Sequence, residues 1–152
     1  MGVSGGASGG GGSTDTYTGY TPTLTQSGAV AKTVDAGRTR YAGTSGSTVK
    51  VQGFLTVTAV GTANNVVTFT LPSGLNVAGT PASGYTIGVA RLYDSSAGTV
   101  YRGMVVTVDA TTCRIEDPFS TGGNGLGVSG ARFSAALDVG DVVEWSVQYE
   151  AA

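Results

Sequence analysis

The clearest pattern of hydrophobic and polar positions lies close to the C-terminus, in residues 143–150. One face would carry Val143, Trp145, Val147 and Tyr149, and the other Glu144, Ser146, Gln148 and Glu150. A period of two is typical of a β-strand with one buried and one exposed face. Just before it, Leu137 and the Gly140-Asp141 pair predict a tight turn. Each buried apolar side chain would contribute about 1.5–3 kcal/mol, so we expect this strand to anchor the core.

Weaker alternation predicts further strands at residues 37–42, 48–60, 66–71, 85–93, 99–109 and 112–116. Within residues 48–60, Gly53 interrupts the apolar face, which indicates a bulge or a point of close packing. Residues 85–93 and 99–109 are mixed on both faces, which favours cover on each side, for instance by a neighbouring subunit. The tally is seven to nine strands, so we expect a single antiparallel β-sandwich or jelly roll.

Composition supports an all-β fold. The 152 residues include 26 glycines, and only 12% are charged, about half the usual share. Residues 1–16 are mostly Gly, Ser and Thr and have nearly nothing to bury, so we expect an extended arm followed by one domain at residues 17–152. An expression linker is the alternative interpretation of the arm.

Several classes of partner lose support from composition. The net charge is −2 and the basic residues are scattered singly, which argues against nucleic-acid binding. No apolar run approaches the roughly 20 residues that cross a bilayer, and no secretory signal is recognisable, so we expect no membrane partner and synthesis in a cytoplasm. Cys113 is the single cysteine, which excludes an internal disulfide framework.

Catalytic chemistry has few candidates, because the chain contains no histidine. The acidic pairs are Glu116-Asp117 and Asp138 with Asp141. A Ca²⁺ site needs more oxygen ligands than these supply, and we expect Asp138 and Asp141 to shape the turn by bonding local N–H groups. Two acids that meet in space could still form a glycosidase pair, but no spacing singles one out. We therefore predict no enzyme, no metal and no cofactor.

The remaining candidates have structural interpretations. Gly123, Gly125 and Gly127 imitate a phosphate loop without its helix or lysine, so we expect a loop between strands. Cys113 falls in an alternating stretch, where a small core side chain is expected. Tyrosines are common in strands but could also form a sugar-binding platform; they are Tyr17, Tyr20, Tyr41, Tyr85, Tyr93, Tyr101 and Tyr149.

Two stretches carry a resemblance. TYTGYTPTLTQSG, followed by AGRTRY and VKVQGFLTVT, resembles the start of small β-sandwich domains in virion proteins of tailed phages that infect actinobacteria. The closing FSAALDVGDVVEWSVQYE resembles the last hairpin of jelly-roll trimers such as the tumour-necrosis-factor and C1q-like domains. The GRTRY stretch and the long Gly/Ser arm depart from the phage pattern, which leaves open the part of the virion to which the chain belongs.

The resemblance implies a structural or adhesive virion protein, assembled in the host cytoplasm as a homotrimer. We expect a capsid decoration, with its arm bound to the major capsid protein. The alternatives are a minor tail or tail-tip protein that binds a receptor or host surface glycan, a carbohydrate-binding module using surface tyrosines or Trp145, and, least favoured, a cell-wall hydrolase. The residues expected to bind the partner are Val3, Ser4, Gly5, Gly6, Gly10, Ser13, Tyr17 and Tyr20.

Overall fold

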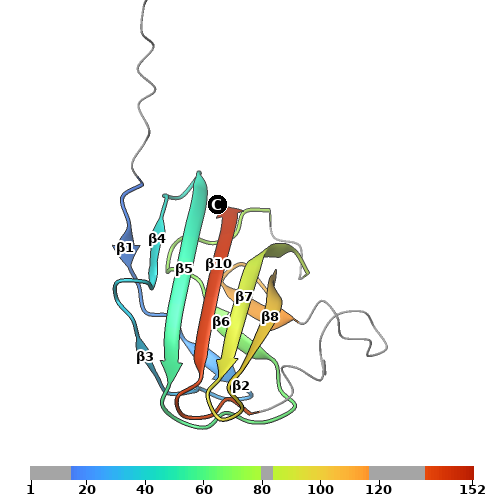
Figure 1. Cartoon of the computed structure of the whole chain (residues 1–152). Coiled ribbons are helices and arrows are strands. Elements are labelled where there is room, and N and C mark those ends of the chain that lie inside the picture. The colour runs from blue at the N-terminus through green and yellow to red at the C-terminus, as the bar shows by residue number, and fades with distance from the viewer. Residues whose placement is uncertain (1–14, 80–83, 117–135) are drawn as a thin grey trace, which may run out of the picture.

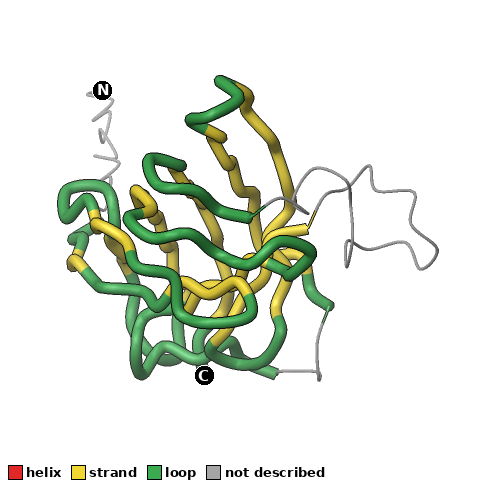
Figure 2. The backbone as a smooth tube through the Cα atoms, turned by 90° about the horizontal axis from the view of Figure 1, so that it is seen from below, coloured by secondary structure: helices red, strands yellow, loops and turns green. Residues whose placement is uncertain are grey.

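A computed structural model describes residues 15–79, 84–116 and 136–152. These residues form strands and loops and contain no helix (Figure 2). The strands are β1 (Thr18–Gly19), β2 (Leu24–Gln26), β3 (Lys32–Val34), β4 (Arg40–Ala42), β5 (Thr48–Val57), β6 (Val67–Thr70), β7 (Thr86–Asp94), β8 (Thr99–Thr107), β9 (Thr112–Glu116) and β10 (Val142–Glu150). The all-β prediction is confirmed. The ten strands described exceed the expected seven to nine, because β1 and β3 are too short to show a period.

The strands belong to one antiparallel sheet in the order β1-β4-β5-β10-β7-β8-β9-β6-β2. Strand β3 pairs with the same edge of β5 as β4 does, but nearer the end of β5. The sheet curls into a half-barrel, with β5, β10 and β7 side by side in front of β6 and β2 (Figure 1). Strand β8 joins the two walls, because its residues up to Val106 pair with β7 while those from Met104 onward also pair with β9. The curled sheet is therefore continuous from wall to wall, which the expectation of a sandwich or jelly roll did not include.

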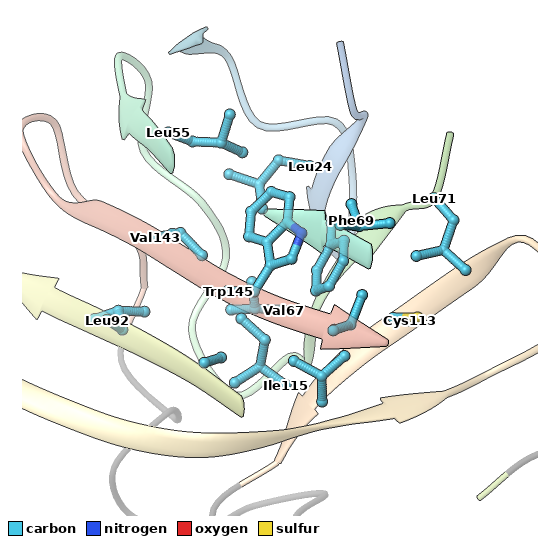
Figure 3. Close-up of a cluster of buried hydrophobic side chains, with 14 of the residues drawn as sticks. Leu24, Leu55, Val67, Phe69, Leu71, Leu92, Cys113, Ile115, Val143 and Trp145 are labelled. Carbon is cyan, nitrogen blue, oxygen red and sulfur yellow. The ribbon is translucent and has the colours of Figure 1, made fainter. Parts of the chain in front are cut away.

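The core fills the inside of the curl. β10 presents Val143, Trp145, Val147 and Tyr149 to it, as the alternation predicted. The Trp145 ring stacks on Phe69 from the opposite wall, with ring centroids 4.0 Å apart (Figure 3). Gly53 lies opposite Trp145 in the β5–β10 pairing, and a Cβ built on it would fall 2.1 Å from the indole ring. Gly53 is thus a close packing point; the pairing runs in register through it, so the alternative of a bulge is wrong.

The predicted strand bounds need small corrections. β5 ends at Val57 rather than residue 60, β4 begins at Arg40 rather than residue 37, and β8 ends at Thr107 rather than residue 109. Strand β4 begins late because residues 37 and 38 belong to a turn. The Asp35 carboxylate holds this turn by accepting hydrogen bonds from the backbone N–H groups of Gly37 and Arg38. Such Asx turns compete with strand pairing.

The turn before β10 is organised by a buried carboxylate. Asp141 is 2% exposed, and its side chain accepts hydrogen bonds from the Ser95 N–H, the Ser95 hydroxyl and the Asp138 N–H. The first two join this turn to the loop between β7 and β8. The predicted turn-shaping role is therefore confirmed for Asp141, whereas Asp138 takes part through its backbone.

Candidate functional site: a groove on the open face of the sheet

A large hollow lies on the outer face of β5, β10, β7 and β8, away from the core. Its volume is about 620 Å³. A second hollow of about 300 Å³ continues it along β10, and the two share Gln52, Val89 and Ser146. We call the two together the β10 groove.

Two rows of outward-facing side chains build the groove. In the first row the pairing sets Phe54, Glu144, Arg91 and Arg102 side by side across four strands. The second row consists of Gln52, Ser146 and Val89, and the pairing continues it to Met104, which lines neither hollow. Cross-strand partners share a face, so each row is fixed by register alone. Ser146 is the β10 residue in the second row, and its small side chain makes the groove deeper at this point.

Charged groups are concentrated along the first row. Arg91 Nη1 lies 2.8 Å from a Glu144 carboxylate oxygen. The Arg38 guanidinium lies 3.3 Å from the centroid of the Phe54 ring and pairs with Asp35 at 2.7 Å. The hydrogen bond from Arg38 holds the pKa of Asp35 below its usual value. Among the described residues Arg102 makes no ion pair, although it stands directly opposite Arg91.

The root of the arm borders the second hollow. Tyr17 lines it, and the Arg40 guanidinium lies over the Tyr17 ring at 4.3 Å. Arg40 also donates a hydrogen bond of 3.2 Å to the Gln52 side chain. Asp15 forms an ion pair of 2.6 Å with Lys50, and hydrogen bonding to Asp15 raises the pKa of Lys50. These contacts fix residues 15–17 on the same face as the groove.

The residues expected to bind a partner fall into two groups. Val3, Ser4, Gly5, Gly6, Gly10 and Ser13 lie outside the described residues. Tyr17 lines the groove, whereas Tyr20 packs edge-on against Tyr41 with its centroid 6.1 Å away. The Tyr20 hydroxyl and the Trp145 indole nitrogen are both buried without a well-formed hydrogen bond, and burial raises the pKa of Tyr20 far above its usual value. Tyr20 thus closes the core where the arm joins the domain.

The tyrosines do not gather into a sugar-binding platform among the described residues. Tyr149 is buried in the core and donates a hydrogen bond to the Leu75 carbonyl. Tyr41 and Tyr101 pack against the core, and Tyr85 is exposed at the start of β7. Trp145 is also in the core, 4% exposed, so its indole ring is not available as a surface for a sugar.

The acidic and sulfur candidates are explained by packing. Glu116 is buried and pairs with Arg114, while its expected neighbour Asp117 lies outside the described residues, as do Gly123, Gly125 and Gly127. Cys113 is fully buried, and burial raises the pKa of its thiol to about 12, so a core role rather than a nucleophilic one fits it. Within residues 15–79, 84–116 and 136–152 no three His, Cys, Asp or Glu side chains are placed to hold a metal ion.

Sequence reasoning missed the groove. Each of its residues is unremarkable in the sequence, because the rows come from four strands separated by loops of different length. One signal was present: Phe54 falls on the polar side of the alternation in β5, and Val89 lies on the same side of β7 as Arg91. Val89 is 62% exposed, so the outer cover expected for β7 is not provided by the described part of this chain.

Comparisons with known proteins found no match. No protein-family model matches the chain, and no curated protein and no solved structure matches it. In the described part of the chain, no helix has the length and apolar character needed to cross a membrane.

Proposed function

We propose that the chain is a structural protein of a tailed-phage virion, a capsid decoration whose arm at residues 1–16 attaches a β-sandwich-like or jelly-roll domain to the particle. The proposal includes assembly as a homotrimer and attachment to the major capsid protein. It starts from the resemblance of the TYTGYTPTLTQSG and FSAALDVGDVVEWSVQYE stretches to virion domains and trimeric jelly rolls.

The observation that carries the proposal is the fixed root of the arm. Residues 15–19 are held to the sheet by the Asp15–Lys50 ion pair, by the Tyr17–Arg40 contact and by the pairing of β1 with β4. Tyr20 then enters the core beside Tyr41. A segment with this anchorage leaves the domain from a defined edge, which is what a tethered module on a particle needs.

A minor tail or tail-tip protein with an adhesive role is the second candidate, and the β10 groove favours it. A hollow with a few polar groups on its wall is a typical site for a small ligand such as a receptor glycan. Labelling intact particles with an antibody against the domain distinguishes the two, since label on the head supports decoration and label on the tail supports the alternative.

The tether is tested by removing residues 1–14, which leaves Asp15 and Tyr17 in place. We expect the truncated chain to keep its circular dichroism spectrum and its oligomeric state by light scattering, and to be absent from purified particles. Gly28→Ala is the matched control, because a Cβ there meets nothing within 4 Å, and it should be incorporated normally. Incorporation of the truncated chain at the normal level would refute the tether.

A further inference from the structure

We propose that the β10 groove binds a carboxylated oligosaccharide, with Arg102 as its main contact to the carboxylate. This goes beyond a place in the virion and does not depend on whether the chain attaches to head or tail. The occupant is inferred from the charge, the pairing and the surface chemistry of the groove.

The charge argument rests on the facing pair Arg91 and Arg102. They are directly opposite in the β7–β8 pairing, where like charges destabilise a sheet. Glu144 neutralises Arg91 from the other side, and no described acid pairs with Arg102. An anion beside Arg102 would relieve the repulsion, and a guanidinium matches a planar carboxylate with two parallel N–H donors. Local rules of stability are most often broken where a protein binds something.

The pairing argument excludes a peptide that binds as an added strand. The groove lies over β10, and β10 is paired along both edges, with β5 and with β7. Peptides recognised as added strands need a free sheet edge. The groove offers side-chain donors instead: the Ser146 hydroxyl, the Gln52 amide, whose oxygen is already taken by Arg40, and the arginines. Sugar hydroxyl groups can accept from such donors.

The surface chemistry fits a sugar better than a nucleic acid. Asp35 and Glu144 already pair with Arg38 and Arg91, so the groove offers a single arginine without an acidic partner among the described residues. One such arginine suits one carboxylate, whereas a run of phosphates needs a run of cations. The exposed Val89 side chain supplies apolar surface on which the C–H face of a sugar ring can rest, beside the Phe54 ring that the Arg38 guanidinium covers. The combination of a few polar groups with an apolar floor is typical of small-ligand sites, and about 620 Å³ is within their usual range.

Binding is tested by isothermal titration of the full chain at low salt with trigalacturonate and with 3′-sialyllactose. We expect at least one of them to bind, and the fully methyl-esterified trigalacturonate, which has no charge, to bind at least tenfold more weakly than its acid. Arg102→Gln should weaken binding of the acid about tenfold or more, because it removes a charged hydrogen bond. Arg102→Lys keeps the charge but not the two parallel donors, so its affinity for the acid should lie between that of the native chain and that of Arg102→Gln.

The control variant is Lys32→Gln. Lys32 is paired with the core residue Val57 and so lies on the other face of the sheet, and its loss changes the net charge by the same amount. It should leave binding unchanged. The proposal is overturned if neither acid binds up to about 10 mM, if the methyl ester binds equally, or if acetate competes as well as the sugar. The proposal would also be overturned if a second copy of the chain occupied the groove, which would show as an oligomer that dissociates when Arg102 is replaced with Gln. None of these results bears on particle attachment, which the arm deletion tests separately.

Discussion

Replacing Gly53 with alanine tests the packing of the core more directly than any other single change. The Trp145 ring lies between β5 and Phe69, stacked on Phe69 at 4.0 Å with an angle of 20° between the rings. An alanine Cβ at position 53 would stand 2.1 Å from both Cε2 and Cζ2 of the indole. To restore ordinary carbon contacts, which begin near 3.5 Å, the ring would have to move by more than about 1 Å. Phe69 blocks that movement.

Overpacking of this kind typically costs about 1–3 kcal/mol, and we expect the upper half of that range because both faces of the ring are occupied. With the slope usual for urea, the midpoint of unfolding should fall by about 1 M or more. Trp145 is the only tryptophan, so its fluorescence reports unfolding at the altered site itself. Gly28→Ala, where a Cβ meets no atom within 4 Å, is the matched control and should stay within about 0.5 kcal/mol of the native chain.

A double-mutant cycle identifies the clash as the cause. In a Trp145→Leu background the indole atoms are gone, and Gly53→Ala should then cost less than about 1 kcal/mol, measured by circular dichroism. If Gly53→Ala were as stable as the native chain, or equally damaging in both backgrounds, the contact between Gly53 and Trp145 would not be what limits this position.

Two further predictions concern buried polar groups. Asp141→Ala should destabilise the fold by about 2–4 kcal/mol, because it leaves the N–H groups of Ser95 and Asp138 without their acceptor, while Asp138→Ala should cost little; equal urea midpoints for the two variants would contradict the assignment of the turn to Asp141. Stability should also fall in alkali: burial raises the folded pKa of Cys113 to about 12 from a usual value near 9 and shifts Tyr20 and Tyr149 upward too, so the folded state holds these protons more tightly. The free energy of unfolding should be steady up to about pH 9 and decline above it, less steeply in Cys113→Ala, and a flat profile up to pH 11 would show that these groups are not buried in the folded chain.

The sequence predicted those elements whose pattern is local. β6, β7, β9 and β10 were expected within one residue of their observed bounds, and the core face of β10 was identified residue by residue, because a half-buried strand records its burial in its own alternation. The short strands β1 and β3 were not identifiable, since two or three residues carry no period and their conformation is set by their partners β4 and β5. The curl was equally hidden: it depends on β8 pairing on both edges over part of its length.

The candidate site was less predictable than the fold. Its residues become neighbours only through the register of four strands, and a shift of one residue in β7 would turn Arg91 and Val89 into the core. Tyr17 was the one groove residue among the expected partner-binding positions, and it was chosen for its place beside the arm rather than for the groove.

The way in which the arm is rooted has a mechanical consequence. A pull on the residues before Asp15 would act first on one exposed ion pair, one ring contact and the two-residue pairing of β1, and only afterwards on Tyr20. These outer contacts can peel in succession while the body of the domain stays intact. The five residues from Asp15 to Gly19, once released, would span up to about 17 Å. A brief force on the arm could thus be taken up by this segment before it reaches the core of the domain.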